Sequence, residues 1–337
     1  MPRRSACTSA LLALTVTLAQ AQGASSRDSF LRLVDRARVP LAPELSALSA
    51  GGPFARERFT FATEDGQRVP GLAVKAAGSA RRPTVIVLHG TGDRKEGMIP
   101  LLEALADRGF LAVAIDGRHH GERAKGPGDY PQAILQAYRT GRGHPFLYDT
   151  TWDAMRLVDY LQSRPDVDGA RIGMMGISKG GMETYLTAAV DPRIAVAVPV
   201  IGVQSFQWAL EHDAWQARVE TILGAVLGAA RDGLRPVDAE FVQEFYDRVV
   251  PGIYAEFDAP AMLPLIAPRP LLVINGDSDD LTPLEGVREA AAAAEQAYRT
   301  ARAEDRFRLL VQPGAGHEFT PSAQRTALDW LARWLRP

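Results

Sequence analysis

The sequence predicts an α/β fold in which a mostly parallel, eight-stranded sheet carries helices on both faces and an inserted helical cap. Short, wholly apolar runs alternate with helical patterns from residue 83 onward, as expected of parallel strands that are buried on both faces. Before them, two segments alternate polar with apolar residues around a turn, which is typical of a hairpin. Residues 203–261 separate two apolar runs, where a much shorter connection is usual.

The composition is that of a globular protein. Of the 337 residues, 46% are hydrophobic and 23% are charged, which provides enough apolar material for a buried sheet and disfavours a disordered chain. The formal net charge of −2 gives no electrostatic case for binding nucleic acid.

The first residues differ from the rest of the chain. Two arginines precede an apolar stretch at 10–19, and Ala19-Gln20-Ala21 follows as a cleavage site of small residues. This pattern is typical of a bacterial secretory signal peptide, so we expect residues 1–21 to be removed and one domain to occupy 22–337. The stretch is too short to span a bilayer, which disfavours the alternative of a membrane anchor. We expect a secreted or periplasmic protein with no membrane anchor after processing.

The predicted elements follow in order. Residues 27–38 have the pattern of a short helix, and 56–63 and 68–76 form the hairpin, which gives the sheet an antiparallel edge. The apolar runs that predict parallel strands are 84–88, 111–115, 171–175, 194–200, 270–274 and 307–311. Helical patterns are found at 97–107, 151–163, 181–190, 283–302 and 321–335.

Residues 203–261 are the predicted helical cap. They carry Trp208, Trp215 and other aromatic residues at spacings compatible with helices. Most of these aromatics are expected to pack the cap onto the core. Trp208 and Trp215 are also candidates for the wall of a substrate pocket.

A glycine-flanked serine stands where an apolar run stops and a helical pattern begins, in Gly176-Ile177-Ser178-Lys179-Gly180. A serine hydroxyl is a poor nucleophile unless it is held on a tight turn, exposed to a base and close to backbone donors. Glycines on both sides let the chain make that turn without a steric clash. This context favours a catalytic nucleophile, Ser178, over an ordinary glycine turn.

Two later strands end in loops that can supply a base and an acid. The strand at 270–274 runs into a loop with Asp277, Asp279 and Asp280, and the last strand runs into a glycine-rich loop with His317. A catalytic serine needs a base and an orienting acid, and in this architecture they follow in the order Ser, Asp, His. His317 is therefore the predicted base. Spacing alone does not separate the three neighbouring carboxylates.

Backbone amides are expected to hold the oxyanion, one directly after the nucleophile and one after an earlier strand. Lys179 provides the first amide. The strand at 84–88 runs into His89-Gly90-Thr91-Gly92, so the Thr91 amide is the predicted second donor. His89, at the end of that strand, is expected to brace the loop by hydrogen bonding rather than to act as a base.

The sequence resembles the α/β-hydrolase superfamily, in particular its dienelactone-hydrolase, acetyl-xylan-esterase and prolyl-oligopeptidase-like branches. The motifs that carry the resemblance are His89-Gly90-Thr91-Gly92, Gly176-Ile177-Ser178-Lys179-Gly180-Gly181, Gly276-Asp277-Ser278-Asp279-Asp280 and Gly316-His317. The resemblance covers nearly all of the chain after the first 21 residues. In the peptidase-like branches the acid is the first of two adjacent aspartates, three residues after the loop glycine. The resemblance therefore implies Asp279 as the acid, with Asp277 and Asp280 as competitors.

Lys179 departs from those branches, in which the residue after the nucleophile is usually neutral. Its ammonium can approach an anionic substrate group or the oxyanion, or it can form a salt bridge away from the pocket. We favour the salt bridge. Different losses on neutral and acidic esters in a Lys179→Ala variant would support recognition of an acid by this side chain.

The segment 116–122 follows another strand end and contains His119 and His120 beside a glutamate. Adjacent residues seldom bind one metal ion, and the segment has no pair of histidines at helical i, i+4 spacing. The single cysteine, Cys7, lies before the predicted cleavage site. We therefore expect no metal and no cofactor. Related hydrolases carry an Asp-x-Arg-x-x-Gly type of loop here, which makes His120 a pocket candidate.

These residues predict a serine carboxylic-ester hydrolase that acts in two steps on small to medium acyl groups. His317 takes the proton of Ser178, and the acyl-enzyme that forms is then hydrolysed by water. The expected partner is a small-molecule or polymer-linked ester. The alternatives are a peptidase or an acyltransferase of the same fold, or, in a different class, a binding protein whose hydrolase fold is inactive.

Overall fold

The computed structural model describes residues 26–48, 53–78 and 80–336. The predicted signal peptide at 1–21 lies outside these residues. The described chain begins with a helix at 26–34, shorter at its end than the predicted 27–38.

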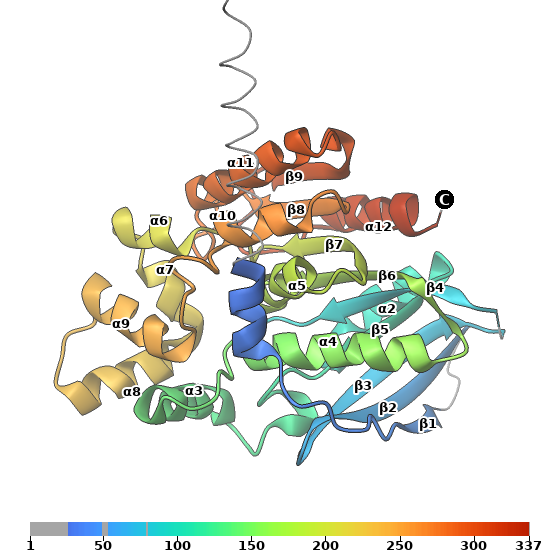
Figure 1. The fold of residues 1–337 in the computed structure, drawn as a ribbon, viewed down its shortest axis with the longest axis horizontal. Coiled ribbons are helices and arrows are strands. Elements are labelled where there is room, and N and C mark those ends of the chain that lie inside the picture. Colours follow the sequence, from blue (N-terminus) through green and yellow to red (C-terminus); the bar gives the residue numbers. More distant parts are fainter. Residues whose placement is uncertain (1–25, 49–52, 79, 337) are drawn as a thin grey trace, which may run out of the picture.

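A single sheet runs through the molecule, in the strand order β1-β2-β3-β5-β4-β6-β7-β8-β9 (Figure 1). The strands are β1 (Glu44–Leu48), β2 (Phe54–Glu64), β3 (Gln67–Ala76), β4 (Arg82–Leu88), β5 (Leu111–Ile115), β6 (Val167–Ile177), β7 (Ile194–Val200), β8 (Leu271–Gly276) and β9 (Phe307–Gln312). The pairs formed by β1 with β2, β2 with β3 and β3 with β5 are antiparallel, and all later pairs are parallel. The predicted fold class is confirmed.

The sheet has one strand more than predicted. The extra strand, β1, pairs with β2 at the outer edge, in a segment for which the sequence predicted neither a helix nor a strand. Its side chains are mostly exposed, and Leu45 is 55% exposed. Because neither face of β1 is buried, its sequence shows neither alternation nor an apolar run.

Helices cover both faces of the sheet. One face is packed by α2 (Ile99–Asp107) and α12 (Pro321–Leu335), and the other by α4 (Tyr148–Ser163), α5 (Lys179–Val190) and α11 (Leu284–Thr300). Alternate residues of β4 point to opposite faces: Val85 and Val87 pack with α2, whereas Ile86 and Leu88 pack with α4 and α5. Both faces are therefore buried, which is why the parallel strands are apolar throughout.

Residues between β7 and β8 fold into short helices, all but the last of which lie to one side of the sheet (Figure 1). They are α6 (Phe206–Glu211), α7 (Gln216–Val219), α8 (Leu223–Gly233), α9 (Ala239–Val249) and α10 (Ala259–Met262). A helix that the sequence did not predict, α3 (Asp129–Thr140), packs against α8 and α9, and its Tyr138 stacks on Phe245 of α9 at 5.2 Å between ring centroids. We refer to α6–α10 as the cap.

Short 3₁₀ helices complete the connections: η1 (Lys95–Met98), η2 (Gly121–Arg123), η3 (Glu220–Ile222), η4 (Leu263–Ile266) and η5 (Glu304–Arg306). The loops after β4, β5, β6, β8 and β9 all leave the carboxyl edge of the sheet, because these strands are parallel. In open α/β sheets this edge is where ligands bind. It is also where every predicted catalytic residue lies.

Candidate active site

Ser178 lies on the turn between β6 and α5. Its φ of 56° and ψ of −116° place a non-glycine residue in a conformation that costs free energy. The flanking glycines are required: a Cβ on Gly176 would lie 2.1 Å from the carbonyl oxygen of Gly180, and one on Gly180 would lie 2.4 Å from that of Leu88. The Ser178 N–H donates to the Val200 carbonyl at 2.9 Å. The turn therefore holds the serine hydroxyl at the carboxyl edge of the sheet.

Ser178, His317 and Asp279 form a continuous chain of hydrogen bonds. The distance from His317 Nε2 to Ser178 Oγ is 2.8 Å, and His317 Nδ1 lies 2.8 Å from Asp279 Oδ2 and 3.0 Å from Oδ1. With its proton on Nδ1, the imidazole donates to the carboxylate and presents the Nε2 lone pair to the serine hydroxyl. That is the arrangement a general base requires.

Asp279 is held as a carboxylate. Its side chain is fully buried, and burial opposes ionisation, but hydrogen bonds from His317 and Thr282 outweigh this effect and keep the Asp279 pKa below its ordinary value. The backbone N–H groups of Leu281 and Thr282 donate to Oδ1 at 2.9 and 3.1 Å. Among the three aspartates of this loop, Asp277 and Asp280 are exposed, and Asp277 accepts from the Gly314 N–H at 2.9 Å. Asp279 is thus the carboxylate that contacts His317.

The turn after β4 lies directly beside the serine. A Cβ on Gly90 would be 3.5 Å from the Ser178 Cβ, so the Thr91 amide belongs to a segment that borders the hydroxyl. The Lys179 N–H is in the first turn of α5, where amides have no partner within the helix. Both predicted oxyanion donors are therefore backbone groups of segments that adjoin Ser178.

His89 joins two of the loops at this edge. Its Nδ1 lies 2.8 Å from the Gly90 carbonyl, and its Nε2 accepts from the Gly117 N–H at 3.0 Å. Burial, with a contribution from the Lys179 charge, lowers the His89 pKa to about 3, so the ring is neutral. These contacts match the bracing role that the sequence predicted.

The Lys179 side chain turns away from the serine and is buried. Its Nζ lies 2.7 Å from Glu183 Oε1, one helical turn along α5, and both side chains are about 1% exposed. Burial raises the Glu183 pKa, and the Lys179 charge opposes that rise. This pair is the salt bridge that we favoured from the sequence.

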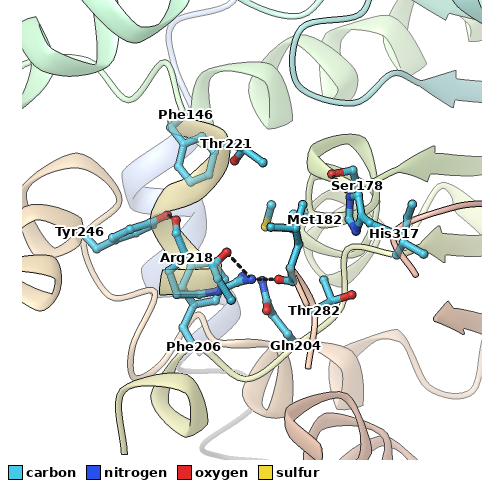
Figure 2. Close-up of a pocket in the computed structure, with 13 residues that line it drawn as sticks. Phe146, Ser178, Met182, Gln204, Phe206, Arg218, Thr221, Tyr246, Thr282 and His317 are labelled. Carbon is cyan, nitrogen blue, oxygen red and sulfur yellow. Dashed lines mark hydrogen bonds between the residues drawn. The ribbon is translucent and has the colours of Figure 1, made fainter. Parts of the chain in front are cut away.

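A cavity opens beside Ser178 and His317 (Figure 2). Its floor comes from the sheet edge and α5, and its opposite wall comes from the cap. The lining residues are Phe146, Ser178, Met182, Ile201, Gln204, Phe206, Ala217, Arg218, Thr221, Tyr246, Leu281, Thr282 and His317.

The three pocket candidates from the sequence are not among the residues that line this cavity. Trp208 stacks on His212 at 4.5 Å and faces α11, and Trp215 donates from Nε1 to Asp213 at 3.1 Å. His120 is buried with its ring 4.3 Å from Tyr130, and burial lowers its pKa to about 3. Because the cap helices are short, the sequence did not indicate whether their aromatic side chains would face the cavity.

The adjacent histidines do not converge on one point. His119 Nδ1 lies 3.0 Å from Asp129 Oδ2, whereas His120 Nδ1 lies 2.7 Å from the Arg118 carbonyl. Within residues 26–48, 53–78 and 80–336, no three His, Cys, Asp or Glu side chains are grouped as metal ligands.

Arg218 is the cationic residue among the lining residues that the sequence analysis missed. It lies on α7, and Figure 2 shows it across the cavity from Ser178 and His317. The only sequence signal is a cation among the aromatic residues of a helical insertion, which equally describes a solvent-facing position.

Comparisons with known proteins agree with the fold. The family model described as "Glucuronyl esterase, fungi" matches residues 74–301. The chain is 33% identical over 184 residues to the "Putative hydrolase YtaP" of Bacillus subtilis, which covers 55% of this chain and 52% of that protein. It is 25% identical over 262 residues to the "Putative esterase YitV" of the same organism, covering 75% of this chain and 89% of that protein. The chain thus spans about half the length of the first of these relatives.

Solved structures show the same fold at low sequence identity. The acetyl xylan esterase from Paenibacillus sp. R4 superimposes with a TM-score of 0.64 at 19% identity, covering 95% of this chain and 93% of that one. The glucuronoyl esterase from Solibacter usitatus gives a TM-score of 0.66 at 17% identity, covering 92% of each chain.

Proposed function

The chain belongs to the glucuronyl esterase family, in the dienelactone-hydrolase-like branch of the α/β-hydrolase superfamily, and is therefore an esterase-type hydrolase; from this premise we propose that it cleaves carboxylic esters through an acyl-enzyme on Ser178. The observation that carries the proposal is the hydrogen-bonded chain from Ser178 Oγ through His317 to Asp279.

The proposed reaction has two steps. His317 Nε2 takes the hydroxyl proton while Ser178 Oγ attacks the ester carbonyl, and the Thr91 and Lys179 amides donate to the oxyanion. The protonated imidazole then gives its proton to the alkoxide. The alcohol departs, and the acyl group remains bound to Ser178 as an acyl-enzyme. In the second step His317 activates water, the acid is released and Ser178 regains its proton.

Asp279 has an electrostatic and a positioning role in this scheme. Its carboxylate holds the proton of the imidazole on Nδ1, so that Nε2 is free to accept the serine proton. It also stabilises the imidazolium that forms. The low pKa of Asp279 keeps it charged over the range in which an esterase works.

We propose that the substrate is an ester carried on an extracellular carbohydrate polymer, with a small to medium acyl group. The support comes from the matched family and from neighbours of the same fold that are described as acetyl xylan and glucuronoyl esterases. The signal-peptide pattern at 1–21 supports export to the periplasm or the medium. Within the described part of the chain, no helix is long and apolar enough to cross a membrane.

The experiment that tests the proposal is a substrate panel with a nucleophile variant as control. Nitrophenyl esters from acetate to decanoate, acetylated xylan and a methyl ester of glucuronic acid are offered to the wild-type protein and to Ser178→Ala. We expect turnover of several esters by the wild type and none above background by the variant. Absence of ester turnover by the folded wild type, or equal rates in both proteins, would reject the proposal.

A further inference from the structure

Arg218 is a buried cation without a counter-ion. It is only 5% exposed, and in the part of the chain that the structure describes no carboxylate forms an ion pair with it. Its Nη2 donates to the carbonyls of Ala217, at 2.8 Å, and Leu281, and its guanidinium lies 5.0 Å from the Phe206 ring centroid. Nε is buried without any hydrogen-bond partner. Neutral carbonyls and an aromatic ring thus surround a full positive charge.

Asp258, the carboxylate whose charge acts on Arg218, already has hydrogen-bond partners of its own. Asp258 accepts hydrogen bonds from the backbone of Phe206, Gln207 and Ala259 and from the Ser205 hydroxyl, at 2.8–3.1 Å. Its carboxylate therefore accepts hydrogen bonds from the first N–H groups of α6 and α10. The other ionisable groups around Arg218 are the phenols of Tyr185, Tyr246 and Tyr254. These side chains do not neutralise a guanidinium at ordinary pH.

Arg218 lines the cavity that contains Ser178, on the side opposite the serine (Figure 2). Burying an unpaired charge is costly, and proteins normally provide a partner for it. A guanidinium is the side chain best matched to a carboxylate, because its N–H groups form two parallel hydrogen bonds to the two oxygens. A missing partner in a substrate cavity points to the substrate as the source of that carboxylate.

We propose that Arg218 recognises a carboxylate on the substrate, so that the enzyme prefers esters that carry a free carboxylate besides the ester bond. This inference rests on the proposed function, since it assigns the substrate class of the same site. Arg218 is a specificity residue in this account and takes no part in proton transfer.

A purely structural role is the alternative. The bond from Arg218 to the Leu281 carbonyl ties α7 to the loop that carries Asp279. The Tyr246 hydroxyl in turn donates to the Arg218 carbonyl and links α7 to α9. If Arg218 only joins these elements, its replacement lowers the rate for charged and neutral esters alike.

The test uses matched substrate pairs, with the carboxylate on either side of the ester. Monomethyl glutarate is compared with methyl pentanoate, and 4-acetoxybenzoate with 4-acetoxybenzamide. We expect wild-type kcat/KM to favour the charged member in at least one pair. We also expect glutarate to inhibit hydrolysis of a neutral ester competitively, and glutaramide to inhibit it weakly. A wild type without preference in either pair and without selective inhibition by glutarate overturns the inference.

Variants then assign the preference to the residue. Arg218→Met should lower the charged-to-neutral ratio of kcat/KM by roughly 10- to 100-fold, mainly through KM, as expected for loss of hydrogen bonds to a charged group. Arg218→Lys should recover part of the ratio, and Arg231→Met, which removes a surface charge from α8, should leave it unchanged. An equal loss on both members of each pair contradicts the proposal. If Arg218→Met does not fold, the two wild-type measurements decide.

Serine-dependent hydrolysis of the neutral members separates this inference from the proposed function. If neutral esters are cleaved without any preference for charge, the esterase stands and the carboxylate site does not. If no ester is cleaved, the proposed function itself fails.

Discussion

Two arginines of this protein are buried to a similar degree in two different regions, and their surroundings are opposite. Arg118, at the carboxyl edge of the sheet, is 8% exposed and donates to Asp153 at 2.8 and 3.0 Å, with Glu64 as a further partner. Although burial opposes its charge, these carboxylates raise the Arg118 pKa. Arg218, in the cap, is 5% exposed, and burial without a carboxylate lowers its pKa.

The presence or absence of a carboxylate partner distinguishes an arginine that stabilises the fold from one that is available to a ligand. At the sheet edge the buried charges are paired inside the chain, as in Arg118 with Asp153 and Lys179 with Glu183. In the cap the charge that borders the cavity is unpaired. We therefore expect substitutions at the sheet edge to affect every ester or the stability, and substitutions at Arg218 to affect the choice of ester.

The largest expected effect is at the nucleophile. Ser178→Ala should lower kcat on charged and neutral esters alike by about 10⁴-fold or more, because no other group can form the acyl-enzyme. The free energy of unfolding should hardly change, since only a hydroxyl is removed. Steady-state kinetics and urea unfolding check the two parts, and residual turnover above one hundredth of the wild-type rate would contradict the assignment.

The acid should give the next largest effect. Asp279→Asn should lower kcat by roughly 10²- to 10⁴-fold, because an asparagine favours the wrong tautomer of His317. Asp277→Asn is the matched control on the same loop and should stay within a few-fold of the wild type, because Asp277 is exposed and does not contact His317. A larger loss of kcat in Asp277→Asn than in Asp279→Asn would instead assign the role of the acid to Asp277.

A substitution of Asp153 tests whether the paired charge of Arg118 stabilises the fold. Asp153→Asn should lower the free energy of unfolding by about 3–5 kcal/mol at pH 7, because it leaves Arg118 and Arg123 buried without their shared carboxylate. Burial opposes ionisation of Asp153, but the two guanidiniums outweigh it and hold its pKa below the ordinary value.

A lowered pKa in the folded state fixes the direction of the pH dependence. The contribution of Asp153 is complete above its unfolded pKa of about 4 and is lost as the pH falls further. Urea unfolding of the wild type and the variant should thus show a difference in the free energy of unfolding that is constant near neutral pH and becomes smaller below about pH 4. A difference in the free energy of unfolding that increases in acid would contradict the assigned ion pairs.

The smallest expected effect concerns Lys179. Replacing both partners, as Lys179→Met with Glu183→Gln, removes the pair without leaving a lone buried charge. The charged-to-neutral ratio of kcat/KM should stay within about twofold of the wild type, whatever the change in kcat, because the ammonium points away from the cavity. A selective loss on charged esters would transfer carboxylate recognition from Arg218 to Lys179.

What the sequence could predict depended on local geometry. The glycines around Ser178 and the loops that follow β8 and β9 are short-range signals, and the parallel strands bring their ends to one edge without further information. Asp279 was separated from its neighbours only by a family resemblance. The structure supplies what spacing lacked, because it buries Asp279 and leaves Asp277 exposed.

What the sequence could not predict depended on tertiary contacts. The edge strand β1 has no buried face, and α3 is defined by its packing on α8 and α9. The orientations of Trp208, Trp215 and Arg218 follow from how short cap helices fold back on the core, and periodicity over four to six residues does not determine a face.

The most direct test of the central claim, that Ser178 at the sheet edge performs the chemistry, is covalent labelling. The wild-type protein is treated with a fluorophosphonate, digested and mapped by mass spectrometry, beside Ser178→Ala. We predict a single adduct on the peptide that contains Ser178 and none in the variant. A folded wild type that does not react, or an adduct on another residue while Ser178 stays free, would contradict the account.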